Sequence, residues 1–129
     1  MVSEALRVHF TNHLAAMCAN CDAADMVMVA TLDGRLVAEH QRKSYQGERA
    51  AVMSSSLMAL GDAIAKELDL GTCQIIISEN DKGIVLFKHI ALDFVLVCLT
   101  ESSGGLGTLL SWTKRSAEDM SKGAPALAA

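Results

Sequence analysis

Cys18 and Cys21 are separated by two residues, which is the spacing of a redox-active pair or of half a zinc site. The chain has no second pair at this spacing, and His9 and His13 lie one helical turn apart further upstream. On a continuous helix Cys18 points about 180° away from His9, so the four groups do not converge on one ion. The pair also ends a predicted helix, where the dipole disfavours a thiolate. The sequence therefore favours a packing role for these thiols over redox or metal chemistry.

Hydrolytic and phosphate-binding chemistry have no complete motif either. The histidines are scattered along the chain and form no Ser–His–Asp order. The glycines of residues 104–107 precede a predicted helix, as a phosphate-binding loop would, but no Lys-Ser/Thr follows them. They are expected to allow close backbone packing at a strand-to-helix turn. We therefore predict no catalytic residue, no cofactor, no metal and no enzymatic activity.

Arg42, Lys43 and Arg49 place three cations close to the start of a predicted helix. They are candidate contacts for an acidic patch on a partner protein. A solvated basic loop has the same composition, and it is the favoured interpretation.

Length and composition are typical of one globular domain. The chain has 129 residues, of which 51% are hydrophobic and only 4% aromatic, and its net charge is −4. This composition excludes a disordered chain, and it argues against nucleic-acid binding because basic faces and aromatic stacking platforms are not evident. Charge-free runs such as 50–61 and 102–113 span 12 residues, which is too short for insertion across a membrane. The start Met-Val-Ser-Glu lacks the pattern of a secretory signal, so we expect a cytoplasmic location with reduced thiols.

The hydrophobic pattern predicts elements in the order α-β-β-α-β-β-β-α. Apolar residues three and four apart predict helices at 3–20, 47–68 and 104–121, and continuous apolar runs predict strands at 26–31, 35–40, 73–78, 84–88 and 94–99. The short connections between strands require antiparallel pairing. The fold class is therefore α+β, an α/β sandwich in which helices cover both faces of a five-stranded antiparallel sheet. Residues 1–122 are predicted to form a single domain, and residues 123–129 around Pro125 a flexible C-terminal tail.

The predicted helix at 47–68 has two apolar stripes instead of one. The first is a seam of larger side chains, namely Met53, Leu57, Leu60, Ile64 and Leu68. The second consists mainly of small residues, namely Ala50, Ser54, Met58, Gly61 and Ala65. Small residues permit close approach of another helix, so we interpret the second stripe as a buried subunit interface. The alternative is an unusually apolar surface helix, or one covered by a loop.

The predicted strand at 73–78 begins a three-stranded meander and so lies at a sheet edge. Edge strands of monomers are normally protected by Lys, Pro or a bulge, and none of these interrupts the run around Cys73, Ile75 and Ile77. Either another part of the chain covers this edge or a second molecule pairs with it. Pairing is the favoured interpretation, and it agrees with the interface predicted on the helix.

Four stretches have a characteristic order and spacing: the hairpin at 29–37, the Ser- and Ala-rich helix at 50–61, the Asp81-Lys82-Gly83 turn, and the segment 105–110. Together they resemble the Roadblock family of dynein light chains and its bacterial relatives. The resemblance covers about residues 5–121 and implies a Roadblock-like domain that forms a homodimer or heterodimer. In the family the third strands of two protomers usually pair, with the second helices side by side. Bacterial members resemble regulators of Ras-like small GTPases, and the family has no catalytic residue set to carry over.

The predicted function is that of a cytoplasmic, non-enzymatic dimeric regulator or adaptor that binds a Ras-like small GTPase. The predicted interface comprises Ala50, Ser54, Met58, Gly61, Ala65, Cys73, Ile75 and Ile77. Two alternatives remain: a dimeric scaffold subunit with no effect on GTP hydrolysis, and a small-ligand sensor. The expected partners are a second copy of the chain and a small GTPase. We expect no binding to nucleic acid and no insertion into a membrane.

Overall fold

The computed structural model describes residues 2–91 and 93–128, and its helices and strands follow the predicted order with one helix added. The helices are α1 (Glu4–Asn20), α2 (Gly47–Glu67), α3 (Leu106–Ser121) and the short α4 (Ala124–Leu127). The strands are β1 (Met26–Thr31), β2 (Leu36–Gln41), β3 (Ile75–Asn80), β4 (Gly83–Ile90) and β5 (Phe94–Thr100). The α+β class and the five-stranded antiparallel sheet are therefore confirmed.

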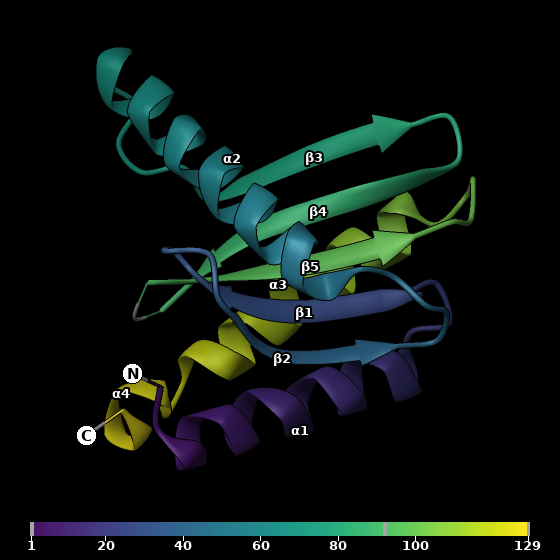
Figure 1. Cartoon of the computed structure of the whole chain (residues 1–129). Helices are drawn as coiled ribbons and strands as arrows, with labels where there is room; N and C mark the ends of the chain where they lie inside the picture. The colour runs from purple at the N-terminus through teal and green to yellow at the C-terminus, as the bar shows by residue number, and fades with distance from the viewer. Residues whose placement is uncertain (1, 92, 129) are drawn as a thin grey trace.

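All five strands lie in one sheet, in the order β2-β1-β5-β4-β3. Figure 1 shows α2 crossing one face of this sheet, with α1 and α3 on the other. β1 and β5 are the buried central strands because helices cover both of their faces. β3 and β2 form the two edges.

Alternation along β5 separates two hydrophobic cores. Phe94, Leu96 and Cys98 belong to the larger core under α1 and α3, and the intervening Val95 and Val97 belong to the smaller core under α2. The larger core includes Phe10 of α1, whose ring meets Phe94 edge to face with the centroids 5.0 Å apart. The whole of the sheet is thus fixed between helices, except at its edges.

The C-terminal segment differs from the flexible tail predicted for 123–129. Its residues 124–127 form α4, with Ala124 fully buried and Pro125 in the first turn, where its fixed φ suits a helix. The hydroxyl of Ser3 donates a hydrogen bond of 2.6 Å to the carbonyl oxygen of Leu127. The end of the chain therefore packs against the start of α1. Met1 and Ala129, which the predicted domain and tail included, lie outside the described residues.

Candidate interaction surface

α2 carries an apolar stripe that its own sheet does not cover. We call this surface the α2 stripe; it comprises Val52, Met53, Leu60, Ile64 and Leu68. The exposed fractions of these side chains lie between 52% for Ile64 and 70% for Met53. In Figure 1 the second half of α2 extends past the β3 edge of the sheet. A continuous exposed apolar surface of this kind is typical of a protein-binding site.

The structure corrects the predicted position of this surface. Ser54, Met58 and Ala65, predicted to lie at a subunit interface, are buried within the single chain, and Met58 is fully buried in the core between α2 and the sheet. Ala50 and Gly61 of the same stripe are half-buried. The seam of larger residues faces outward instead. The two faces of α2 are therefore exchanged relative to the prediction.

Close helix–sheet approach is the physical reason for this exchange. The buried hydroxyl of Ser55 donates to the carbonyl oxygens of Thr31 at 2.7 Å and of Ala51 at 2.9 Å, which ties α2 to the end of β1. A Cβ atom added at Gly61 would lie 2.9 Å from Cys73 Sγ. Most residues on the face toward the sheet are therefore small, with Met58 as the large exception, and the bulky aliphatic side chains lie outside.

β3 is an edge strand, as predicted, but it spans Ile75–Asn80 instead of 73–78. Among the described strands, β3 forms hydrogen bonds with β4. Ile76 belongs to the core under α2, so the alternating Ile75 and Ile77 lie on the opposite face, where Ile77 is 43% exposed. Cys73 precedes the strand, and its backbone N–H donates to Asp62 Oδ1 of α2 at 2.9 Å. The uncharged first half of β3 thus lies directly beside α2.

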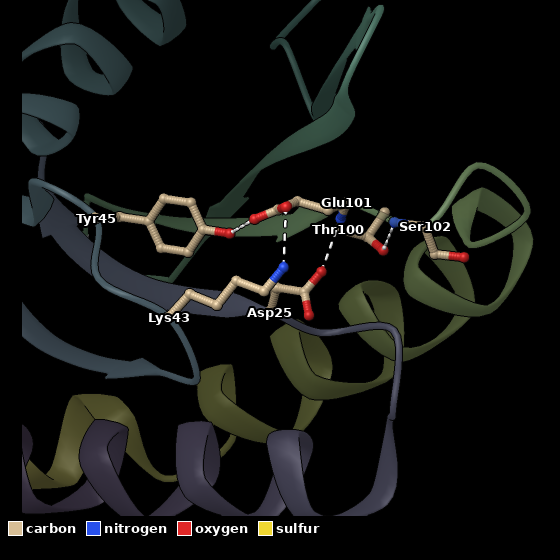
Figure 2. Close-up of polar contacts among 6 residues, drawn as sticks. All are labelled: Asp25, Lys43, Tyr45, Thr100, Glu101 and Ser102. Atoms are coloured by element: carbon tan, nitrogen blue, oxygen red, sulfur yellow. Dashed lines mark hydrogen bonds and ion pairs between the residues drawn. The ribbon is translucent and has the colours of Figure 1, made fainter.

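A polar cluster around Glu101 fixes the loop that leads into α2 (Figure 2). The Glu101 carboxylate accepts hydrogen bonds from the Tyr45 hydroxyl and from Lys43 Nζ, the latter at 3.0 Å. The Glu101 backbone N–H donates to Asp25 Oδ2 at 2.7 Å. The Tyr45 and Lys43 bonds lower the pKa of Glu101, while burial and the neighbouring carboxylate raise the pKa of Tyr45. The ends of β5 and of this loop are therefore held together beside β1.

The three cations predicted as partner contacts do not form one patch. Arg42 donates to the carbonyl oxygens of Cys18, Cys21 and Asp22, the last at 2.7 Å, and so closes the C-terminal end of α1. Lys43 is bonded to Glu101 as described above. Arg49, in the first turn of α2, donates to Gln46 at 3.3 Å. Lys43 and Arg49 are both exposed, and they remain the cations closest to the start of α2.

The cysteines and histidines differ in burial, since three cysteines are buried whereas Cys73 and the four histidines are half-buried. Cys18, Cys21 and Cys98 are buried, and burial raises the pKa of Cys18 and raises that of Cys98 to about 12. These two thiols are therefore protonated at neutral pH. Over residues 2–91 and 93–128, no group of three or more His, Cys, Asp or Glu side chains is arranged to hold a metal ion.

The two histidines of α1 lie at its contact with α3. His9 Nε2 donates to the carbonyl oxygen of Met120 at 2.9 Å, and the His9 and His13 ring centroids are 4.6 Å apart. Burial and the neighbouring His9 lower the pKa of His13. The His9 hydrogen bond thus joins α1 to α3, on the face of the sheet opposite α2.

Among the described helices, none combines the length and the hydrophobicity needed to cross a bilayer.

A scan against protein-family models and a search of curated proteins found no match. Solved structures, however, match almost the whole chain. MglB of Myxococcus xanthus superposes with a TM-score of 0.88 at 16% identity, covering 98% of this chain and 95% of that one. MglB in a tetrameric arrangement gives 0.87 at 18% identity, with 98% and 96% covered.

A Roadblock/LC7 domain of Streptomyces avermitilis also matches, with a TM-score of 0.77 at 15% identity over 91% of this chain and 96% of that one. Identities this low establish the shape of the chain and carry no activity with them. The resemblance seen in the sequence is thereby confirmed at the level of architecture: this chain has the fold of MglB and of Roadblock/LC7 domains.

Proposed function

We propose that this protein is a dimeric regulator or adaptor, that the α2 stripe and the β3 edge form its subunit interface, and that the dimer binds a Ras-like small GTPase in the cytoplasm. The observation that carries the proposal is the α2 stripe. Single exposed aliphatic side chains are common on monomers, but five on one helix form a continuous surface. A second copy of the chain would cover it.

The energetics favour such an assembly. More than half of each side chain of the α2 stripe is exposed, so burying this area contributes roughly 1 kcal/mol per residue. In a twofold dimer every contact occurs twice, so the stripe contributes about 10 kcal/mol before association costs are subtracted. Antiparallel pairing of two β3 strands would add main-chain hydrogen bonds along the same side of the molecule. The occurrence of MglB in a tetrameric arrangement supports self-association as a property of this fold.

Size-exclusion chromatography with light scattering tests the dimer. The 13.7 kDa chain should give twice that mass at micromolar concentration. Ile64→Glu, on the α2 stripe, should yield a folded monomer because it places a charge in an apolar interface. Val8→Glu is the matched control, since Val8 is 47% exposed but lies on α1, on the other face of the sheet. A monomeric wild type, or equal dissociation of both variants, would contradict the proposed interface.

The GTPase part of the proposal rests on the family resemblance and on the fold shared with MglB. Lys43 and Arg49 are the proposed partner contacts, because both are exposed cations beside the start of α2. Such a protein supplies no catalytic group of its own and acts on the conformation of its partner. The alternative is a dimeric scaffold that leaves GTP hydrolysis unchanged.

Affinity purification from the source cells, followed by a GTP hydrolysis assay, separates these two functions. A co-purified small GTPase whose hydrolysis rate changes on addition of the dimer supports regulation. A co-purified GTPase with an unchanged rate supports the scaffold. Recovery of the dimer with other proteins but without a GTPase would overturn the GTPase proposal.

A further inference from the structure

A pocket lies between β4 and α3 on the face of the sheet opposite α2. It has a volume of about 580 Å³ and opens where β3 begins. Ile75, Ile90 and Ala117 form its apolar wall. Pockets of this volume are typical of small-molecule sites. The pocket lies on the face opposite the α2 stripe, but Ile75 in its wall belongs to β3, whose edge the proposed function places at the subunit interface.

Two ammonium groups line this pocket without a carboxylate partner. Lys88 comes from β4 and Lys114 from α3, and over the described part of the chain neither has a carboxylate within 4.0 Å. Both side chains line the same pocket, and burial together with the Lys114 ammonium lowers the pKa of Lys88. Glu118 also lines the pocket, but its carboxylate lies 3.6 Å from Lys122 Nζ. The pocket lining thus holds two ammonium groups and one carboxylate, in a protein whose net charge is −4.

Two side chains of the pocket, Lys88 and Ser121, can donate further hydrogen bonds to a ligand. Lys88 Nζ donates to Gln74 Oε1 at 3.2 Å, which uses one of its three hydrogens. Ser121 Oγ accepts from the Ala91 backbone N–H at 3.2 Å, so the hydroxyl hydrogen of Ser121 is free to point elsewhere. An oxyanion between these groups would remove the repulsion between the two ammonium groups and accept from all three side chains.

We propose that this pocket binds the phosphate group of a small phosphorylated molecule, with Lys88, Lys114 and Ser121 as its ligands. A phosphate monoester carries about −1.5 to −2 charges at neutral pH, which matches two ammonium groups, whereas a carboxylate needs only one. Lysine commonly binds phosphate as a point charge. The wall of Ile75, Ile90 and Ala117 would contact the body of the ligand.

Titration with inorganic phosphate, followed by two-dimensional NMR of the whole chain at constant ionic strength, tests this proposal. Saturable shifts are expected at Lys88, Ala91 and Ser121, and a matched titration with acetate should give at least about tenfold weaker binding because it carries one charge. The double variant Lys88→Gln/Lys114→Gln should lose the shifts. Its melting temperature should not fall, because the substitutions remove like-charge repulsion.

Two further variants make the test specific. Lys82→Gln removes an exposed lysine from the β3–β4 turn and should leave phosphate binding unchanged. Glu118→Gln removes the acidic lining group and should tighten binding by about twofold to fivefold. Absence of saturable shifts up to tens of millimolar, equal binding of acetate, or an equal loss in Lys82→Gln would each overturn the proposal. None of these outcomes depends on whether the chain binds a GTPase, and repeating the phosphate titration on Ile64→Glu separates phosphate binding from dimerisation.

Discussion

Arg42 shows how one side chain can fix the end of a helix. Its guanidinium donates to three carbonyl oxygens at the C-terminal end of α1, a position where backbone acceptors have no partners within the helix. A positive charge there also interacts favourably with the helix dipole. The residue thus stabilises the fold of a single chain, whatever else the basic loop contacts.

Replacing Arg42 with Met should therefore lower the free energy of unfolding. The expected loss is about 1–2 kcal/mol, because charged hydrogen bonds to the helix end are lost while the apolar stem is kept. Urea denaturation measures this loss. Arg49→Met, which removes one bond of 3.3 Å to Gln46, is the control and should change stability little. Equal stability of both variants would show that Arg42 does not close α1.

Glu101 makes stability depend on pH. Its pKa is lowered by the Tyr45 and Lys43 hydrogen bonds, so the folded state favours the ionised carboxylate. The stabilisation is fully present above 4.5, the ordinary pKa of a glutamate, and is lost as pH falls through the lowered pKa of the folded state. Glu101→Gln should therefore melt at a lower temperature than the wild type at pH 7, and the difference should shrink toward pH 3.

Thermal melts monitored by circular dichroism across this pH range test that dependence. Asp22→Asn provides a control, since Asp22 is an exposed carboxylate at the end of α1. A constant difference between wild type and Glu101→Gln from pH 7 to pH 3 would rule out the ionised carboxylate as the cause.

At the scale of single elements, α2 has two apolar faces with opposite roles. Met58 is fully buried, so Met58→Ala should lower the free energy of unfolding by about 2–5 kcal/mol. Leu60 is 57% exposed, so Leu60→Ala should cost less than about 1 kcal/mol in the monomer. Denaturation at concentrations low enough to keep the chain monomeric compares the two. Similar losses would mean that both faces are buried within one chain.

The two helical glycines Gly61 and Gly107 make a second comparison. Nothing lies within 4 Å of a Cβ added at Gly107, in the first turn of α3, so Gly107→Ala should stabilise the chain by up to about 0.5 kcal/mol through helix propensity. A Cβ at Gly61 would meet Cys73 Sγ at 2.9 Å and Ile76 Cδ1 at 3.0 Å. Gly61→Ala should therefore gain less or destabilise the chain. Equal stabilisation in urea melts would contradict the close contact between α2 and the start of β3.

Periodicity predicted the order of the elements because each strand and each helix carries its own hydrophobic pattern. It could not choose between the two faces of α2, since both repeat every three to four residues. The choice depends on how closely a helix must approach a sheet that lies elsewhere in the chain, as the Ser55 and Gly61 contacts show. The α4 helix was missed for a similar reason, because burial of Ala124 becomes visible only when α1 is in place. The pocket under α3 could not be predicted either, because Lys88 of β4 and Lys114 of α3 are far apart in the sequence and no local motif marks either of them.

At the scale of the whole molecule, the α2 stripe and the pocket under α3 lie on opposite faces of the sheet. The α2 stripe is apolar, whereas the pocket lining includes Lys88, Lys114 and Glu118. Salt therefore distinguishes the two kinds of contact. Raising the salt concentration from about 0.05 M to about 0.5 M should leave the dimer mass unchanged, because burial of apolar surface is not screened.

Light scattering of the wild type in both buffers measures the dimer mass. Phosphate binding to the pocket serves as a comparison, because salt should weaken it. Dissociation of the dimer by salt would indicate an interface held mainly by ion pairs and would contradict the role given to the α2 stripe.

The two edges of the sheet are not equivalent. β3 begins with Ile75, Ile76 and Ile77 and carries its one charged residue, Glu79, next to its end. β2 ends in Glu39, His40 and Gln41, and the Glu39 carboxylate accepts from Gln41 Nε2 at 2.8 Å. Charged residues on an edge strand disfavour further strand addition. If two β3 strands pair, the joined sheet ends in a β2 strand on both sides. Growth by this route would then stop at two chains, so the same exposed edge that allows assembly would not seed a fibre.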